Sequence, residues 1–278
     1  MGYIKILRPA NFIFVGICVF FGAMYPTFQL EGYFWRIMAA AFSAMLIAGA
    51  GYVVNDYFDL DIDRINKPHR MLPSGMMFPR TALIYGLMLF FCGIILSYFT
   101  TSITCILLAF INAVLLYLYA RYFKREFVSG NIVVAYTAAS TFVYGGVVTG
   151  NLEQSLIIAV YAFLYTLMRE IIKDMEDRDA DAQNGAKTLA IRWQKNSVIN
   201  LFLVAVVIII LLSGFLYMDM RINNSVLVLL MFFVILPLMI FYRILKTTNK
   251  ENIYRRISQL MKLDMFILLL IFIIGNNI

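Results

Sequence analysis

The feature that most constrains the fold of this chain is a series of apolar runs about 20 residues long, separated by short polar stretches. A helix of about 20 apolar residues crosses the hydrocarbon core of a bilayer, which is about 30 Å thick. Most of the runs lack the polar face that a helix in a water-soluble protein presents to solvent. Only 14% of the residues are charged, and the mean hydropathy is +0.83. The sequence therefore predicts an all-α polytopic membrane protein and disfavours a soluble helical one.

The number and spacing of the runs predict nine transmembrane helices in a single membrane domain covering residues 1–278. No linker or low-complexity segment divides the chain, and nothing in the first run suggests a cleavable signal peptide. The third and fourth runs are joined only by F99-T-T-S, which predicts a tight antiparallel hairpin. The predicted spans are residues 11–26, 33–55, 80–99, 101–120, 129–149, 154–172, 197–217, 225–244 and 257–275.

The basic residues predict the orientation. Lys and Arg gather in cytoplasmic loops of membrane proteins, and with nine spans all 23 of them except Arg36 and Arg221 fall on the side that holds the N-terminus. We therefore expect a multi-pass protein of the cell membrane with a cytoplasmic N-terminus. The net charge of +7 is mainly this topology signal. It also suits an anionic leaflet or an anionic substrate, but no soluble basic domain exists to bind nucleic acid.

The stretch N55-D-Y-F-D-L-D-I-D places four aspartates directly after the second predicted span. Asp56, Asp59 and Asp63 have the spacing i, i+3, i+7, which puts them on one face of a helix, and Asp61 falls off that face. Close carboxylates repel one another unless positive charge lies among them. Mg²⁺ binds in this way, through one or two carboxylates together with substrate phosphates.

The same spacing recurs in K173-D-M-E-D-R-D-A-D. Adding 118 to 56, 59, 61 and 63 gives Asp174, Asp177, Asp179 and Asp181. Four predicted spans lie between the two copies, so both should open on the cytoplasmic side. We interpret this as a parallel internal duplication, with pseudo-repeats at about 1–120 and 121–240 followed by a last helix. The two acidic faces are expected to confront each other across one cavity.

Cationic side chains in the neighbouring loops are candidates for binding a diphosphate group, although the positive-inside rule explains some of them by itself. Mg²⁺ and these cations would neutralise the leaving diphosphate, and an apolar membrane cavity would suit a long isoprenoid chain. His69 is expected to be solvated. The diphosphate-binding candidates are Arg70, Lys124, Lys173, Lys67 and Arg125.

Several segments together resemble the UbiA superfamily of intramembrane prenyltransferases. N55-D-Y-F-D-L-D-I-D is similar to the first acidic motif of that family, and R169-E-I-I-K-D-M-E-D-R-D-A-D is similar to the second. The R8-P-A-N, N66-K-P-H-R-M-L-P-S-G, Y117-L-Y-A-R-Y-F-K-R, G130-N-I-V-V-A and G185-A-K-T-L segments also look like family landmarks. The resemblance implies a helix bundle around a central cavity, with two Mg²⁺ ions bridged to diphosphate. It further implies Asn11 in the substrate cavity, Asn55 and Asp59 in catalysis, and metal binding by Asp56, Asp59, Asp63, Asp174, Asp177 and Asp181.

The second motif followed by G185-A-K-T-L is most similar to the digeranylgeranylglyceryl phosphate synthase branch. This implies transfer of a geranylgeranyl group from its diphosphate to geranylgeranylglyceryl phosphate, with Asp181 as the expected proton acceptor. The loop beginning at Asn66 also resembles enzymes that prenylate quinone or chlorophyll precursors, so an aromatic acceptor stays open. A cation transporter is a remote alternative, because its carboxylates normally lie nearer the bilayer midplane. No obligate protein partner is indicated.

Overall fold

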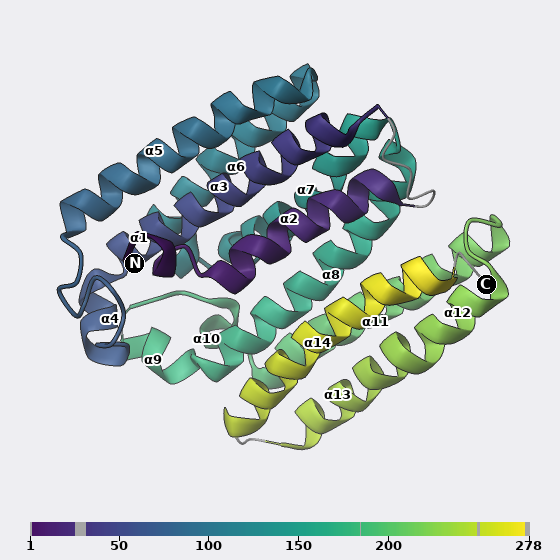
Figure 1. The fold of residues 1–278 in the computed structure, drawn as a ribbon. Coiled ribbons are helices and arrows are strands. Elements are labelled where there is room, and N and C mark those ends of the chain that lie inside the picture. The colour runs from purple at the N-terminus through teal and green to yellow at the C-terminus, as the bar shows by residue number, and fades with distance from the viewer. Residues whose placement is uncertain (1, 26–31, 184, 249–250, 276–278) are drawn as a thin grey trace. The chain divides into compact units, whose positions relative to one another are not determined.

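The computed structural model describes residues 2–25, 32–183, 185–248 and 251–275, and within these ranges every regular element is a helix (Figure 1). Each of the nine predicted spans lies on one of the long helices or helical runs, as far as the described residues reach; residue 26 lies outside them. The long elements are α2 (Pro9–Met24), α3 (Phe34–Phe58), α5 (Pro79–Ser97), α6 (Ile103–Arg121), α7 (Ser129–Thr149), α8 (Leu152–Glu176), α11 (Lys195–Met218), α12 (Asn224–Leu230) with η3 (Met231–Ile235) and α13 (Leu236–Thr247), and α14 (Glu251–Gly275). The short helices are α1 (Gly2–Lys5), α4 (Leu60–Asn66), η1 (Tyr98–Thr100), η2 (Phe123–Arg125), α9 (Arg178–Gln183) and α10 (Leu189–Arg192).

Seven of the helical runs in the described chain are long and apolar enough to cross a membrane, namely α3, α5 with η1, α6, α7, α8, α11, and α12 to α13. α2 is apolar but shorter, with 16 residues. Many large apolar side chains point outward, among them Phe91, Phe110 and Leu211. A helix whose outer surface is apolar is stable in lipid, where all its backbone groups are paired within the helix. The structure thus supports a multi-pass membrane protein.

The described residues divide into two compact units. Unit 1 comprises Met1–Lys124 and Tyr136–Val160, and unit 2 comprises Arg125–Ala135 and Tyr161–Ile278. The boundaries pass through α7 and α8, so each of these helices belongs to both units. The first acidic motif lies in unit 1 and the second lies in unit 2.

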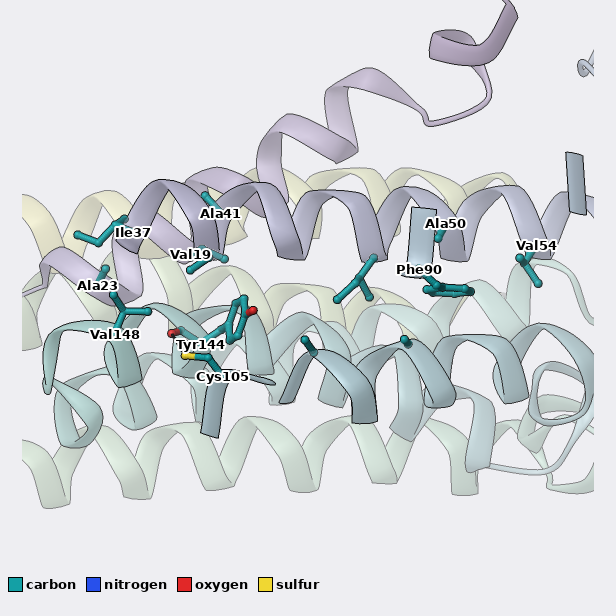
Figure 2. Close-up of a cluster of buried hydrophobic side chains, with 14 of the residues drawn as sticks. Val19, Ala23, Ile37, Ala41, Ala50, Val54, Phe90, Cys105, Tyr144 and Val148 are labelled. Carbon is teal, nitrogen blue, oxygen red and sulfur yellow. Dashed lines mark hydrogen bonds between the residues drawn. The ribbon is translucent and has the colours of Figure 1, made fainter. Parts of the chain in front are cut away.

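Small residues on α3 form the core of unit 1. α3 packs against α2, α5 and α6, and the cluster in Figure 2 includes Ala41, Ala50 and Val54 of α3 together with Phe90 of α5 and Cys105 of α6. Small side chains let membrane helices approach closely, since lipid provides no hydrophobic force between them. The run A-A-A-F-S-A-M-L-I-A-G-A-G in α3 therefore produces a tightly packed central helix.

Polar side chains and glycines join the other helices of unit 1. The Ser43 hydroxyl donates to the carbonyl of Gly93 at 2.7 Å and lies 2.9 Å from the Tyr144 hydroxyl, and such interhelical hydrogen bonds hold membrane bundles together. α2 and α7 come so close that a Cβ at Gly22 or Gly145 would overlap the backbone of the opposite helix. Both positions therefore require glycine.

Unit 2 contains the start of α7, the C-terminal part of α8 and the helices α9 to α14. The Tyr161 hydroxyl on α8 lies 2.7 Å from that of Ser213 on α11, and the Tyr161 ring meets Phe272 of α14 edge to face. Near Pro237 the apolar run of α12, η3 and α13 contains one π-helical turn. Proline removes a backbone donor, and π-turns are a common way to accommodate such a break. These contacts fix the face of α8 that points toward α11 and α14.

Candidate active site

The first acidic motif lies where α3 ends. The predicted single helix is interrupted at Asp59, whose φ of −89° and ψ of 1° end α3 before α4 begins. The hydrogen-bond pattern nevertheless continues across the interruption: the Asp59 N–H donates to Asn55 and the Asp63 N–H donates to Asp59, at 2.9 and 2.8 Å. Because the ladder is preserved, Asp56, Asp59 and Asp63 remain buried, with 6%, 4% and 4% of their surfaces exposed.

Three cations neutralise these buried carboxylates. Arg70, in the loop after α4, contacts Asp56 at 3.2 Å and Asp63 at 2.5 Å. Lys124 of η2 pairs with Asp59. Buried like charges require compensation of this kind, because desolvation and mutual repulsion both oppose ionisation. Arg70 and Lys124, two of the predicted diphosphate-binding residues, are thus positioned directly at the first motif.

The third cation is Arg8, to which the sequence analysis gave no role at the site. Its guanidinium pairs with Asp56 at 2.6 Å and lies 4.9 Å from the centre of the Tyr52 ring. Its backbone has a φ of 55°, unusual for a residue other than glycine. Pro9 begins α2 immediately afterwards, and a strained residue at the entry of a helix is typical of functional positions. In the sequence, Arg8 stands directly before the first apolar run. The positive-inside rule explained it there as a cytoplasmic charge.

Asn55 provides the observation that bears most directly on a metal. Its side-chain N–H donates to Asp59 at 2.8 Å, while its buried Oδ1 has no hydrogen-bond partner in the described chain. Such an orphaned acceptor is costly unless a ligand satisfies it. Oxygen atoms from Asn55 and the neighbouring carboxylates form the donor set that Mg²⁺ prefers. The residues of the first motif therefore fit the predicted metal.

The second motif repeats the backbone geometry of the first. α8 ends at Glu176, and α9 begins after Asp177. The Asp177 N–H donates to Lys173 and the Asp181 N–H donates to Asp177, both at 2.8 Å. These positions are 118 residues beyond those of the first motif, and the helix is interrupted at the equivalent aspartate. The duplication seen in the sequence thus extends to local structure.

The environment of the second motif differs from that of the first. Asp174 accepts a hydrogen bond of 2.8 Å from the buried side chain of Asn131 on α7. The sequence analysis assigned no role to Asn131, although it lies in the G130-N-I-V-V-A segment. Asp177 is exposed and Asp181 is half-buried. Beside Asp174, an amide therefore donates the hydrogen bond that cations donate to the carboxylates of the first motif.

The other predicted site residues differ in their surroundings. The Lys67 N–H donates to the carbonyl of Asp63 at 2.8 Å. Lys173 pairs with Glu170 on the same helix at 2.8 Å. The Arg125 carbonyl accepts from the Lys187 N–H at 2.8 Å, and its side chain is exposed. Lys67, which follows α4, is exposed, and Asn11 on α2 is half-buried. Their roles stay predictions.

Asp61, which was expected to lie off the first acidic face, does lie away from the buried carboxylates. The Asp61 side chain is 92% exposed, and among the described residues it pairs only with Arg64, whose side chain is 61% exposed. In the second motif, Glu176 pairs with Arg255 of α14, and Asp179 is exposed. Asp61 and Asp179 therefore lie at the surface, whereas the Glu176 side chain is only 17% exposed.

Among the described residues, no group of three or more His, Cys, Asp and Glu side chains is arranged to hold a metal ion by itself. A Mg²⁺ ion bound through one or two carboxylates and several phosphate oxygens does not need such a group. The arrangement is therefore suited to a metal that arrives with a phosphorylated substrate.

Comparison with known proteins shows the family of the chain. Residues 11–270 match the model of the UbiA prenyltransferase family. A digeranylgeranylglyceryl phosphate synthase of Methanococcus aeolicus is 36% identical over 280 residues, covering 99% of this chain and 97% of the relative. The enzyme of the same name from Methanosphaera stadtmanae is 33% identical and covers 98% of each chain.

Solved structures agree with the fold. A structure described as that of digeranylgeranylglyceryl phosphate synthase in membranes superimposes with a TM-score of 0.83 at 30% identity, covering 99% of this chain and 97% of the other. A UbiA homologue from Archaeoglobus fulgidus, bound to GPP and Mg²⁺, superimposes with a TM-score of 0.70 at 18% identity, covering 98% and 99%. The family model, the full-length relatives and the shared fold together show that this chain belongs to the UbiA prenyltransferase family.

Proposed function

We propose that this protein transfers a geranylgeranyl group from geranylgeranyl diphosphate to the free hydroxyl of geranylgeranylglyceryl phosphate, in a Mg²⁺-dependent reaction. The name carried by its full-length relatives supports the choice of substrates. The single observation that carries the proposal is the first acidic motif, where three buried carboxylates lie among Arg8, Arg70 and Lys124. This arrangement provides metal ligands and diphosphate-binding cations in one place.

Mg²⁺, when bound, would neutralise the diphosphate and stabilise the charge that develops as it leaves. Asn55, Asp56, Asp59 and Asp63 would hold it at the first motif, and Asp174, Asp177 and Asp181 at the second. The presence of two motifs supports two ions.

The chain's own residues would prepare the diphosphate for departure. Arg8, Arg70 and Lys124 neutralise carboxylates in the structure described here, and in the proposed complex they also donate hydrogen bonds to diphosphate oxygens. Charge-assisted hydrogen bonds of this kind are stronger than neutral ones. Lys173, Lys67 and Arg125 are proposed as further diphosphate contacts, and Asn11 as part of the substrate cavity.

The proposed reaction breaks the allylic C–O bond, and the diphosphate leaves with the electron pair. The hydroxyl oxygen of the acceptor then forms a bond to the allylic carbon and loses its proton. We assign this proton to Asp181, which is half-buried at the second motif. A dry, apolar environment protects the allylic cation from water.

The membrane arrangement is also part of the proposal. Seven helical runs meet the length and hydropathy of a span, and adding α2 and α14 gives the nine spans of the sequence prediction. Both acidic motifs then lie on the side that holds the basic residues, which is the cytoplasmic face of the cell membrane.

A product assay tests this function. Purified protein would be incubated with geranylgeranyl diphosphate, Mg²⁺ and a panel of acceptors that contains geranylgeranylglyceryl phosphate, 4-hydroxybenzoate, a dihydroxynaphthoate and homogentisate. We expect mass spectrometry to detect a digeranylgeranyl ether of glycerophosphate that disappears when a chelator is added. A prenylated aromatic product instead would contradict the assigned acceptor, and no product from folded protein would contradict prenyl transfer.

A further inference from the structure

A polar cavity lies within unit 2, beside the second acidic motif, and none of the residues assigned to diphosphate binding lines it. Its volume is about 250 Å³, and its lining comes from α8, α9, α10, α11 and α14. Arg178, Lys195 and Tyr254 contribute the polar groups, together with the carboxylate of Asp179. Two cationic side chains and one phenol therefore surround a space that no described side chain fills.

Arg178 and Tyr254 differ in burial. Arg178 is exposed, and it forms no ion pair with the residues that the structure describes. Tyr254 is only 6% exposed, and its hydroxyl makes no hydrogen bond to another described residue. Buried tyrosine hydroxyls usually find a partner. Both groups are hydrogen-bond donors that line the same cavity, so one acceptor bound there could accept from both.

Arg178 and Tyr254 both line this cavity. Burial raises the pKa of the Tyr254 phenol, and the positive charge of Arg178 acts in the opposite direction. The phenol therefore keeps its proton at neutral pH, and it can donate to an anion.

Lys195 adds a fixed positive charge and a helix terminus. It is the first residue of α11, and its ammonium group is held by the carbonyl of Thr248 at the end of α13. The preceding residue, Gln194, gives the helix no side-chain cap. The N-terminus of a long helix carries partial positive charge and free N–H groups that favour anions. Among the residues that line the cavity, Asp179 is the only carboxylate.

The location of the cavity limits what the anion can be. Lys195 begins a helix that is long and apolar enough to cross the membrane, so the cavity lies level with the end of a span, where lipid headgroups are found. Its volume of about 250 Å³ is large enough for a phosphate group.

We propose that this cavity binds the phosphate group of a membrane lipid. Arg178 and the N-terminal end of α11 with Lys195 neutralise the phosphate, and the Tyr254 hydroxyl donates a hydrogen bond to one of its oxygens. The phosphate can come from two sources: the phosphomonoester of the acceptor lipid, or the phosphodiester of an anionic bilayer lipid. Only the first source rests on the proposed function.

Lipid titration monitored by native mass spectrometry tests the proposal, without prenyl donor or Mg²⁺, so a failure of the proposed function does not affect it. The three probes are phosphatidate, phosphatidylglycerol and diacylglycerol, all with the same acyl chains. We expect both phospholipids to bind the wild-type protein more tightly than diacylglycerol does. A preference of about tenfold or more for phosphatidate would assign the acceptor's phosphomonoester, and equal affinities would assign a bilayer phospholipid.

Variants make the test specific to the cavity. In the double variant Arg178→Gln and Lys195→Gln, we expect the dissociation constant for phosphatidate to rise about tenfold or more, because two charge-assisted contacts are lost. Tyr254→Phe should weaken binding by a smaller factor. The control, Arg243→Gln with Lys246→Gln, removes the same charge from exposed positions on α13 and should leave binding unchanged. Equal binding of diacylglycerol, no loss in the cavity variant, or an equal loss in the control would overturn the proposal.

Discussion

Replacing Asp59 with asparagine should lower the rate of prenyl transfer by roughly 100-fold to 1,000-fold, the range seen when a group that stabilises charge in the transition state is removed. Asp59 is buried and paired with Lys124, and it accepts a hydrogen bond from Asn55. Its carboxylate is therefore at the centre of the proposed metal and diphosphate site. An amide of the same shape keeps the packing but removes the charge. Steady-state kinetics with geranylgeranyl diphosphate would measure the effect.

Asp61→Asn is the matched control for this prediction. Asp61 lies two residues away in the same motif, but its side chain is exposed and pairs only with Arg64. We expect its rate to stay within about twofold of the wild type, since exposed ion pairs contribute little. Comparable losses in both variants would show that general negative charge, rather than the buried face, is what the reaction needs.

Replacing Arg70 with glutamine should destabilise the metal-free protein. Arg70 contacts both Asp56 and Asp63, and removing one partner of a buried ion pair leaves an uncompensated charge that costs about 3–5 kcal/mol. Because the Arg70 side chain is 24% exposed, solvent screening reduces the expected loss to about 2 kcal/mol. In a protein of this size that corresponds to a fall of about 5 °C in the unfolding temperature. Thermal unfolding in detergent, in the presence of a chelator, would measure it.

Mg²⁺ alone should then stabilise the Arg70→Gln variant more than the wild type, because the arginine no longer competes for the two carboxylates. Arg64→Ala serves as the control, since Arg64 pairs with the exposed Asp61. It should unfold at nearly the wild-type temperature with or without Mg²⁺. Equal stabilisation of the wild type and Arg70→Gln by Mg²⁺ would be inconsistent with metal binding at Asp56 and Asp63.

The positions of the helices could be predicted from the sequence because run length and hydropathy are local properties. The predicted span at residues 129–149 has the same bounds as α7, and the others differ from their helices by a few residues. For α14, hydropathy predicted only part of the helix. Its first turns carry Glu251, Arg255, Arg256 and Lys262, so the helix extends well beyond the apolar run that predicted it.

The repeated spacing of the aspartates also identified both acidic motifs, but it could not predict their backbone. A spacing of i, i+3, i+7 fits a continuous helix, whereas the structure interrupts the helix at Asp59 and at Asp177. The hydrogen bonds on either side of each interruption are kept, which is why the carboxylates of the first motif still share a buried environment.

Contacts between distant parts of the chain could not be predicted from the sequence. Arg8 meets Asp56 across 48 positions, and Asn131 meets Asp174 across 43, so no local pattern joins them. At Lys173, by contrast, the contact is local. It was predicted to bind diphosphate because it adjoins the second motif, but a carboxylate three positions earlier on the same helix, Glu170, pairs with it in the structure.

The most direct test of the central claim is the binding of Mn²⁺, as a paramagnetic substitute for Mg²⁺, followed by electron paramagnetic resonance with and without a non-hydrolysable prenyl diphosphate. The account predicts weak binding of the metal alone and tight binding when the diphosphate is present. It also predicts loss of the tight binding in Asp59→Asn but not in Asp61→Asn. Tight Mn²⁺ binding without diphosphate, or unchanged binding in Asp59→Asn, would contradict a metal held jointly by the first acidic motif and the substrate.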